Sequence, residues 1–137
     1  MFTCNVLFSQ AVTLANKYNR EDSGDVNKDV TLLLYSDSSF FYFGIYDNKK
    51  IPDSYIWYSY GHYSSSTNNI ILNSTDFSNK KDNIIQLVKG YYGKRSDHRR
   101  IENYYEFTDE IYRNYILNKN LNSIVDTKKS MEYYLVK

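Results

Sequence analysis

The densest group of cationic side chains in the sequence lies between residues 91 and 100, beginning with a pair of tyrosines. Cationic side chains bind phosphates, and tyrosine rings offer planes on which bases can stack. This segment, the basic loop, is therefore a candidate site for nucleic acid or another anionic surface. A simpler interpretation is a solvated connection between two helices, with its arginines paired to Glu102 and Glu106. The residues of the basic loop are Tyr91, Tyr92, Lys94, Arg95, His98, Arg99 and Arg100.

The two histidines, His62 and His98, are the candidates for proton-transfer chemistry. Two imidazoles beside cationic groups could supply the general acid and base of a metal-independent ribonuclease. Nothing in the sequence brings them together, and the spacings typical of zinc sites, phosphate-binding glycine loops and serine nucleophiles are missing. Cys4, the single cysteine, lies in a predicted helix without electropositive neighbours, so it is a poor nucleophile. We therefore expect a non-catalytic protein that uses no metal and no cofactor.

Tyrosine, serine and asparagine, with 16, 15 and 15 residues, make up a third of the chain. This combination is typical of protein-binding surfaces, because tyrosine gives large contacts at low entropic cost and the smaller residues give adaptable hydrogen bonds. Abundant Asn, Lys, Ile and Tyr with scarce Ala, Gly, Pro and Arg also indicate an AT-rich gene, which alone would enrich tyrosine. Both interpretations stay open.

On the surface interpretation, the partner-binding residues are strand and loop tyrosines and a nearby histidine. Neighbouring acidic side chains would match a partner with a basic cleft. The predicted partner-binding set is Tyr42, Tyr46, Tyr58, Tyr60, His62, Tyr63, Asp37, Asp47 and Asp53.

Length and charge restrict the class of protein. The 137 residues have the size of one domain, 1–137, and the net charge of +1 gives no global field that would attract nucleic acid or a membrane. No stretch is apolar for long enough to form a spanning helix, and the first residues lack the pattern of a secretion signal. With a single cysteine, these features favour a cytoplasmic protein.

Hydrophobic periodicity predicts the elements. Apolar residues at helical spacing predict a helix over residues 4–19, a second from Phe77 to Tyr92 that ends near Gly90 or Gly93, and a third over 101–118. Alternating β-branched and aromatic runs predict strands at 30–35, 40–46, 55–60 and 69–73. Residues 131–136 fit either an added edge strand or a frayed tail.

This order predicts an α+β fold: an N-terminal helix, a three- to four-stranded antiparallel meander, and two C-terminal helices packed on one face of the sheet. The leading functional hypothesis is an inhibitor that occludes the active site of another protein, such as the immunity protein of a toxin or nuclease, or a phage or viral antagonist. The alternative is a small nucleic-acid-binding module or ribonuclease that uses the basic loop. We expect a monomer or weak dimer; self-association through the C-terminal segment is a third possibility.

Overall fold

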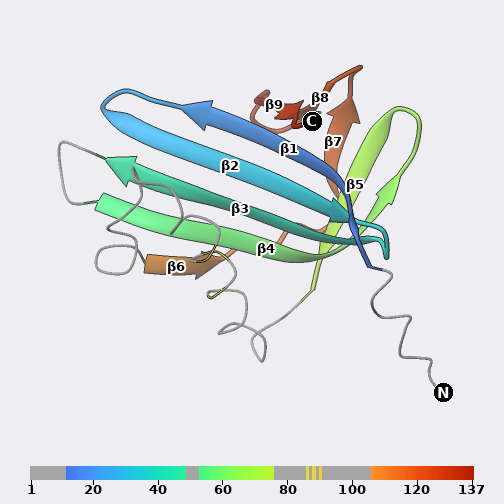
Figure 1. Ribbon diagram of the computed structural model, residues 1–137, viewed down its shortest axis with the longest axis horizontal. Coiled ribbons are helices and arrows are strands. Elements are labelled where there is room, and N and C mark those ends of the chain that lie inside the picture. Colours follow the sequence, from blue (N-terminus) through green and yellow to red (C-terminus); the bar gives the residue numbers. More distant parts are fainter. Residues whose placement is uncertain (1–11, 49–52, 76–85, 87, 89, 91–105) are drawn as a thin grey trace.

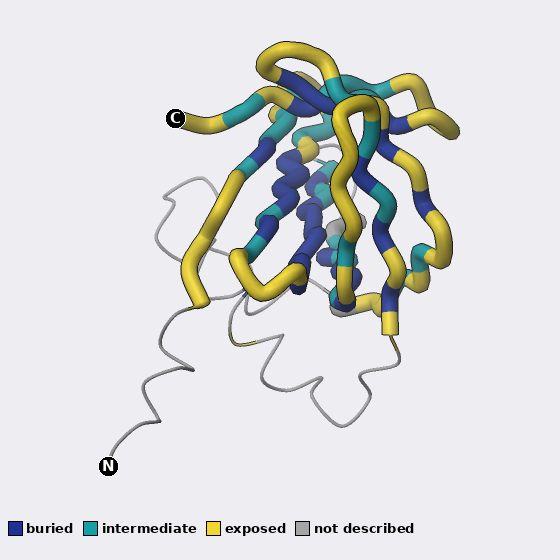
Figure 2. The backbone as a smooth tube through the Cα atoms, turned by 90° about the vertical axis from the view of Figure 1, so that its right-hand side faces the viewer, coloured by how far each residue is buried: buried dark blue, intermediate teal, exposed yellow. Residues whose placement is uncertain are grey.

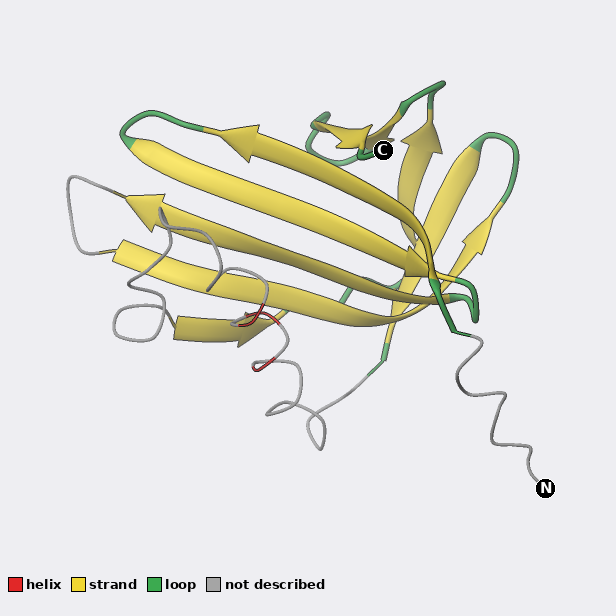
Figure 3. Cartoon of the chain, in the orientation of Figure 1, coloured by secondary structure: helices red, strands yellow, loops and turns green. Residues whose placement is uncertain are grey.

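The computed structural model describes residues 12–48, 53–75, 86, 88, 90 and 106–137. Apart from Gln86, Val88 and Gly90, whose backbone is helical, these residues form strands, turns and loops (Figure 3). The strands are β1 (Leu14–Asp22), β2 (Val26–Tyr35), β3 (Ser39–Asn48), β4 (Asp53–Ser65), β5 (Asn69–Ser74), β6 (Glu106–Asp109), β7 (Tyr115–Lys119), β8 (Ser123–Asp126) and β9 (Glu132–Leu135).

Eight of these strands close into an antiparallel barrel. They follow the order β3-β2-β1-β9-β8-β7-β5-β4, and β4 pairs with β3 to complete the ring (Figure 1). β6 lies outside this ring and pairs with β4 in parallel, from Tyr55↔Glu106 to Tyr58↔Asp109. The predicted α+β fold is therefore wrong, because the described chain closes a sheet on itself and packs no helices on one face of a meander.

Side chains that alternate along the strands separate the barrel interior from its outer face. Phe40 and Tyr42 of β3 point inward and Phe41 and Phe43 point outward, as the alternation in the sequence predicts. The interior cluster draws its buried side chains from the seven strands of the ring other than β4, which packs the partly buried Trp57 and Tyr63 against it. Its buried members are Tyr18, Val30, Leu32, Leu34, Phe40, Tyr42, Ile70, Leu72, Tyr115, Leu117, Ile124 and Tyr133.

A second buried cluster covers the outer face of β3 and β4. It contains Phe41, Phe43, Ile45, Ile56, Tyr58 and Val88, the last from the connection that follows β5. As a result β3 is buried on both faces almost throughout, and Figure 2 shows the dark blue of buried residues gathered in the central strands. Two buried faces explain why neither face of this strand is polar in the sequence.

Gly61 is where β4 changes partner. Residues up to His62 pair with β3, and from Gly61 onward β4 also pairs with β5. A Cβ atom at Gly61 would lie 2.1 Å from the backbone oxygen of Asn73, so only glycine allows β5 to approach so closely. Earlier in β4, from Tyr55 to Tyr58, β6 takes the side that β5 occupies here.

The four predicted strands are confirmed as parts of β2 to β5. Two of the predicted helices are wrong over their described residues: β1 begins at Leu14, inside the first, and residues 106–118 contain β6 and most of β7, inside the third. The rest of both helices, including Cys4, lies outside the described residues. So does most of the helix predicted from Phe77 to Tyr92, of which the described positions 86, 88 and 90 have helical backbone.

The C-terminal segment forms β9, which pairs with β1 on one side and β8 on the other. It is therefore neither an edge strand nor a frayed tail. Among the residues described above, no helix has the length and apolar character needed to cross a membrane.

Candidate ligand-binding site

A cavity of about 100 Å³ opens at one end of the barrel interior. This end, the mouth, is where the β1–β2 turn lies and where β3 ends and β4 begins, because Lys28↔Tyr46 and Tyr46↔Tyr55 are pairs near the ends of their strands. The turn between β8 and β9 completes the rim. The described residues that line the cavity are Lys28, Val30, Ile45, Tyr46, Tyr55, Trp57, Lys129, Met131 and Tyr133.

Trp57 is held in the mouth by the glycine opposite it. Gly44 is its partner across β3 and β4, and a Cβ atom at Gly44 would lie 2.6 Å from Nε1 of the indole. The indole therefore lies directly over the Gly44 backbone, where any other residue would displace it. The half-buried ring also packs against the interior cluster.

Aromatic side chains close the barrel beneath the cavity. The Tyr42 ring meets Trp57 edge-on at 5.0 Å between centroids and lies 5.6 Å from Tyr112. Tyr112 in turn stacks on Tyr115 at 4.4 Å, and Tyr133 meets Tyr42 at 5.9 Å. We call these five rings the aromatic floor. These packed rings fill the barrel interior next to the cavity.

Burial makes the phenols of the aromatic floor harder to ionise. The pKa of Tyr42 is well above its ordinary value, first because of burial and then because Tyr133, Tyr115 and Tyr112 lie close by. Burial also raises the pKa of Tyr112 and of Tyr115, and the nearby carboxylate of Asp126 adds to both shifts. The floor is therefore a neutral surface that includes hydroxyl groups.

Asp126 is the buried carboxylate that shapes the rim. Its Oδ2 accepts a hydrogen bond from the Tyr115 hydroxyl. Its Oδ1 accepts hydrogen bonds from the backbone N–H groups of Lys128 at 2.8 Å and Lys129 at 3.1 Å. These bonds fix the turn that carries Lys129 to the cavity, so Asp126 is a positioning residue.

Two lysines give the mouth its charge. The Lys28 ammonium lies 5.7 Å from the centroid of the Tyr46 ring, which itself stacks on Tyr55 at 4.9 Å. Lys129 reaches the cavity from the opposite rim. Among the described lining residues these are the charged ones, so the mouth offers cations beside aromatic planes.

A larger but shallow groove of about 430 Å³ runs along β1 and β9. Arg20, the cation among its described lining residues, pairs with Asp22 at 3.1 Å and donates to the Glu132 carbonyl oxygen at 3.2 Å. Because its cation is already engaged and its walls are open, this groove suits a small ligand less well than the mouth does.

The structure divides the predicted partner-binding set between the two ends of the barrel. Tyr46 lines the mouth, and Asp47 and Asp53 belong to the same ends of β3 and β4. Asp37 lies in the β2–β3 turn at the other end, beside exposed His62 and half-buried Tyr63. At about 3.4 Å per residue, the ten residues of β3 hold these groups roughly 30 Å apart.

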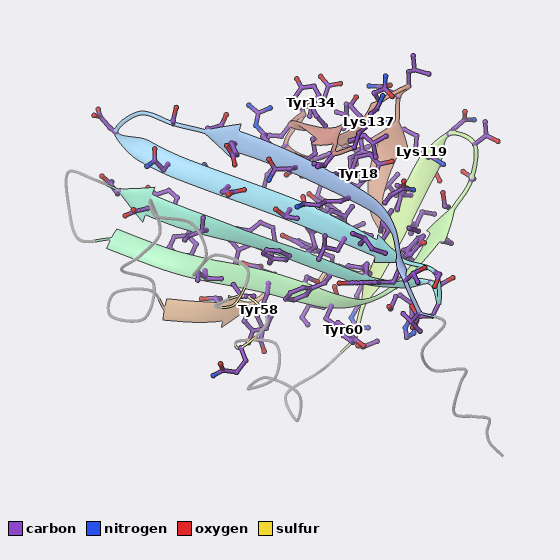
Figure 4. All side chains as sticks on the ribbon, viewed as in Figure 1. Tyr18, Tyr58, Tyr60, Lys119, Tyr134 and Lys137 are labelled. Carbon is purple, nitrogen blue, oxygen red and sulfur yellow. The ribbon has the colours of Figure 1, made fainter. Side chains whose placement is uncertain are left out.

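The remaining members of that set lie between the ends. Tyr42 is 1% exposed inside the barrel, and Tyr58 is fully buried in the outer cluster, with half-buried Tyr60 packed beside it. Figure 4 shows Tyr58 and Tyr60 on the β4 side of the molecule, away from Tyr134. The predicted residues therefore do not form one patch.

Two separate sets of hydrogen bonds stabilise the far end of the barrel. Hydrogen bonds from the Ser39 hydroxyl and N–H lower the pKa of Asp37, and nearby His62 lowers it slightly further. The Tyr63 hydroxyl donates to the Tyr35 carbonyl oxygen at 2.9 Å. These bonds organise the β2–β3 turn.

Every residue of the basic loop lies outside the described residues, so its role in binding nucleic acid stays a prediction. Within the described ranges, no group of three or more His, Cys, Asp or Glu side chains could hold a metal ion.

Sequence reasoning missed most of the mouth. Lys28, Lys129, Met131, Tyr133 and Asp126 come from strands and a turn whose pairing the sequence does not reveal. One signal was available in the sequence. Trp57 lies in one predicted strand and Gly44 in the predicted strand before it. A glycine within a strand indicates that another group approaches its backbone closely.

Comparison of the chain with models of protein families, with curated proteins and with solved structures gives no match. The class of protein therefore has to be argued from the barrel and its mouth.

Proposed function

We propose that the protein is a non-catalytic binding protein whose barrel mouth takes a small organic molecule. The observation that carries this proposal is the cavity itself, in which aromatic planes and two lysines converge on about 100 Å³ above the aromatic floor. Eight-stranded barrels enclose just enough space for side chains or one small ligand, and their mouths are frequent binding sites.

The chain contains its own reporter for this proposal. Trp57 is the single tryptophan and lines the cavity, so a ligand that enters the mouth should change its fluorescence. We would titrate the protein with a panel of small anionic, neutral and cationic compounds while exciting tryptophan selectively. At least one compound should change Trp57 emission saturably and raise the melting temperature.

A variant that fills the cavity tests whether binding occurs there. Met131→Trp places a larger side chain in the mouth and should abolish binding measured by calorimetry, which a second tryptophan does not disturb. Leu121→Trp is the matched control, because Leu121 is 93% exposed in the β7–β8 turn. If no compound in the panel binds, or if Met131→Trp binds as well as the control, the proposed function is wrong.

Inhibition of another protein remains a second proposal, and one observation favours a protein contact. Leu121, Tyr134 and Val136 are exposed apolar side chains near one another, since the Leu135 N–H donates to the Asn122 carbonyl oxygen at 2.8 Å. Co-purification from the native cell should recover one stoichiometric protein, and Leu121→Asp combined with Tyr134→Asp should lose it. Failure to recover any partner would exclude this proposal. A cytoplasmic location is also a proposal, which cell fractionation would test.

A further inference from the structure

We infer that the ligand of the mouth is an aromatic carboxylate: one flat ring that enters the cavity and one carboxylate that remains at the rim. This inference rests on the proposed function and names the chemistry of its ligand. It follows from the size of the cavity, from the charge around it and from the rings that line it.

The size of the cavity selects a single ring. A cavity of 150 Å³ is known to hold benzene, so about 100 Å³ with an open rim accommodates one ring that is not wholly enclosed. The aromatic floor then stops anything longer. Trp57 and Tyr133 belong to both the lining and the floor, so an extended acyl chain would have to displace them to go deeper.

The charge at the rim selects an anion. Lys28 and Lys129 reach the cavity from β2 and from the β8–β9 turn, so one carboxylate at the rim could accept a hydrogen bond from each. Charge-assisted bonds of this kind are about twice as strong as neutral ones. The oxygens of Asp126, the buried acid at the start of the turn that carries Lys129, bind the Tyr115 hydroxyl and two backbone N–H groups rather than either lysine.

The lining selects a flat group rather than a branched one. Tyr46 and Tyr55 stack within 21° of parallel, and the indole of Trp57 lies against the Gly44 backbone, so the walls present aromatic rings. A ligand ring can form offset or edge-on contacts with them. The Lys28 ammonium, already near the Tyr46 ring, needs only to change rotamer to meet a carboxylate at the rim.

Three simple probes separate these requirements. Benzoate has the ring and the charge, benzamide has the ring without the charge, and hexanoate has the charge without the ring. Titrations followed by Trp57 fluorescence should show benzoate binding about tenfold more tightly than either of the others. Benzoate and benzamide have nearly the same size and shape, so a difference between their affinities reports on charge rather than on size.

Lysine variants connect the preference to the mouth. Lys28→Met and Lys129→Met should each weaken benzoate binding about five- to tenfold and leave the affinity for benzamide unchanged. Lys137→Met is the control, because Lys137 is the exposed C-terminal residue and does not line the cavity (Figure 4). Melting temperatures of all three variants would show that they fold.

The possible failures are distinguishable. Equal binding of benzamide and benzoate, or lysine variants that bind benzoate like the wild type, would overturn the anionic ligand while leaving a site for small molecules. Equal binding of hexanoate would overturn the aromatic ring. If benzoate fails to bind while other compounds of the panel bind in the mouth, only this inference is wrong; if nothing binds, the proposed function fails as well.

Discussion

At the scale of single residues, the mouth depends on a glycine opposite a tryptophan. Trp57 can serve both as a wall of the cavity and as part of the aromatic floor only because Gly44 leaves space over its backbone. The same β3–β4 ladder has Tyr46 facing Tyr55 at the next inward-facing pair, where both rings fit side by side. A small residue is thus required at one position of the ladder and not at its neighbour.

We predict that Gly44→Ala disrupts the mouth. The new Cβ atom would lie within 2.6–2.8 Å of three indole atoms, so the ring must move. Overpacking of this kind costs about 1–3 kcal/mol in the free energy of unfolding. Urea unfolding should show this loss, and the emission maximum of the folded protein should shift because Trp57 leaves its half-buried position.

Gly90→Ala is the matched control for this prediction. A Cβ atom at Gly90 meets no atom within 4 Å, so the same substitution there should leave emission unchanged and alter stability by no more than about 1 kcal/mol. Should Gly44→Ala behave like Gly90→Ala, the indole does not lie over the Gly44 backbone.

Burial of the tyrosines separates two interpretations of their abundance. Tyr18, Tyr42, Tyr58, Tyr115 and Tyr133 are all buried, and so serve as large core residues. Their number therefore says little about a protein-binding surface. The sequence could not reveal this, because a tyrosine in a strand is compatible with either face until the pairing of the strands is known.

At the scale of elements, alternation predicted strands well, whereas helical spacing failed for the first and third predicted helices. β2 to β5 have β-branched and aromatic residues between turn residues, which indicate strands locally. Residues 101–118 have apolar side chains at helical spacing as well, but two of them, Ile111 and Ile116, are exposed. In β7 the true pattern is a strict alternation, with Tyr115 and Leu117 buried between exposed neighbours.

β1 shows why local sequence could not suffice. Its residues Leu14 to Asp22 contain no β-branched side chain, and Tyr18 is the buried residue among them. The strand exists because β2 pairs with it along almost its whole length and β9 meets it on the other side. Long-range pairing thus overrides local propensity.

Unequal pairing predicts unequal local stability. β3 pairs with β4 from Ser39↔His62 to Asn48↔Asp53, whereas β9 meets β1 only at Tyr18↔Leu135 and Asn19↔Tyr134. Amides of β2 and β3 should therefore exchange with deuterium only on global unfolding. Those of β8 and β9 should exchange at least about tenfold faster through local opening.

Hydrogen exchange followed by mass spectrometry, with rates corrected using the urea-unfolded chain, would measure this difference. Uniform protection around the ring would contradict it and show that the barrel opens as one cooperative unit.

At the scale of the whole molecule, closure of the barrel brings the site together. The cavity needs β2, β3, β4 and the β8–β9 turn at once, although about 80 residues separate Met131 from the end of β3. The sequence composition predicted the size and near-neutral charge of the domain. Alternation predicted β2 to β5, which are half of the strands in the ring. The closing strands depend on contacts too distant in sequence for any periodicity to show.

The interior tyrosines make the whole barrel sensitive to alkali. Burial raises the pKa of Tyr42, Tyr112, Tyr115 and Tyr133 in the folded state, whereas tyrosines of the unfolded chain titrate near 10. Above that pH the unfolded chain releases protons that the folded chain retains. The contribution of these tyrosines to the free energy of unfolding therefore keeps its full value below about pH 10, and it decreases as the pH rises above that value.

We predict that the free energy of unfolding falls above about pH 10, by up to roughly 1.4 kcal/mol per pH unit for each such tyrosine. Urea titrations between about pH 8 and pH 11 would measure the slope. Tyr42→Phe should make it shallower, because Tyr42 is the most deeply buried of the four. At about pH 8 both proteins hold their phenolic protons, so the difference there gives the cost of the lost hydroxyl alone. An equal slope in the variant and the wild type would show that the phenol of Tyr42 does not resist ionisation inside the barrel.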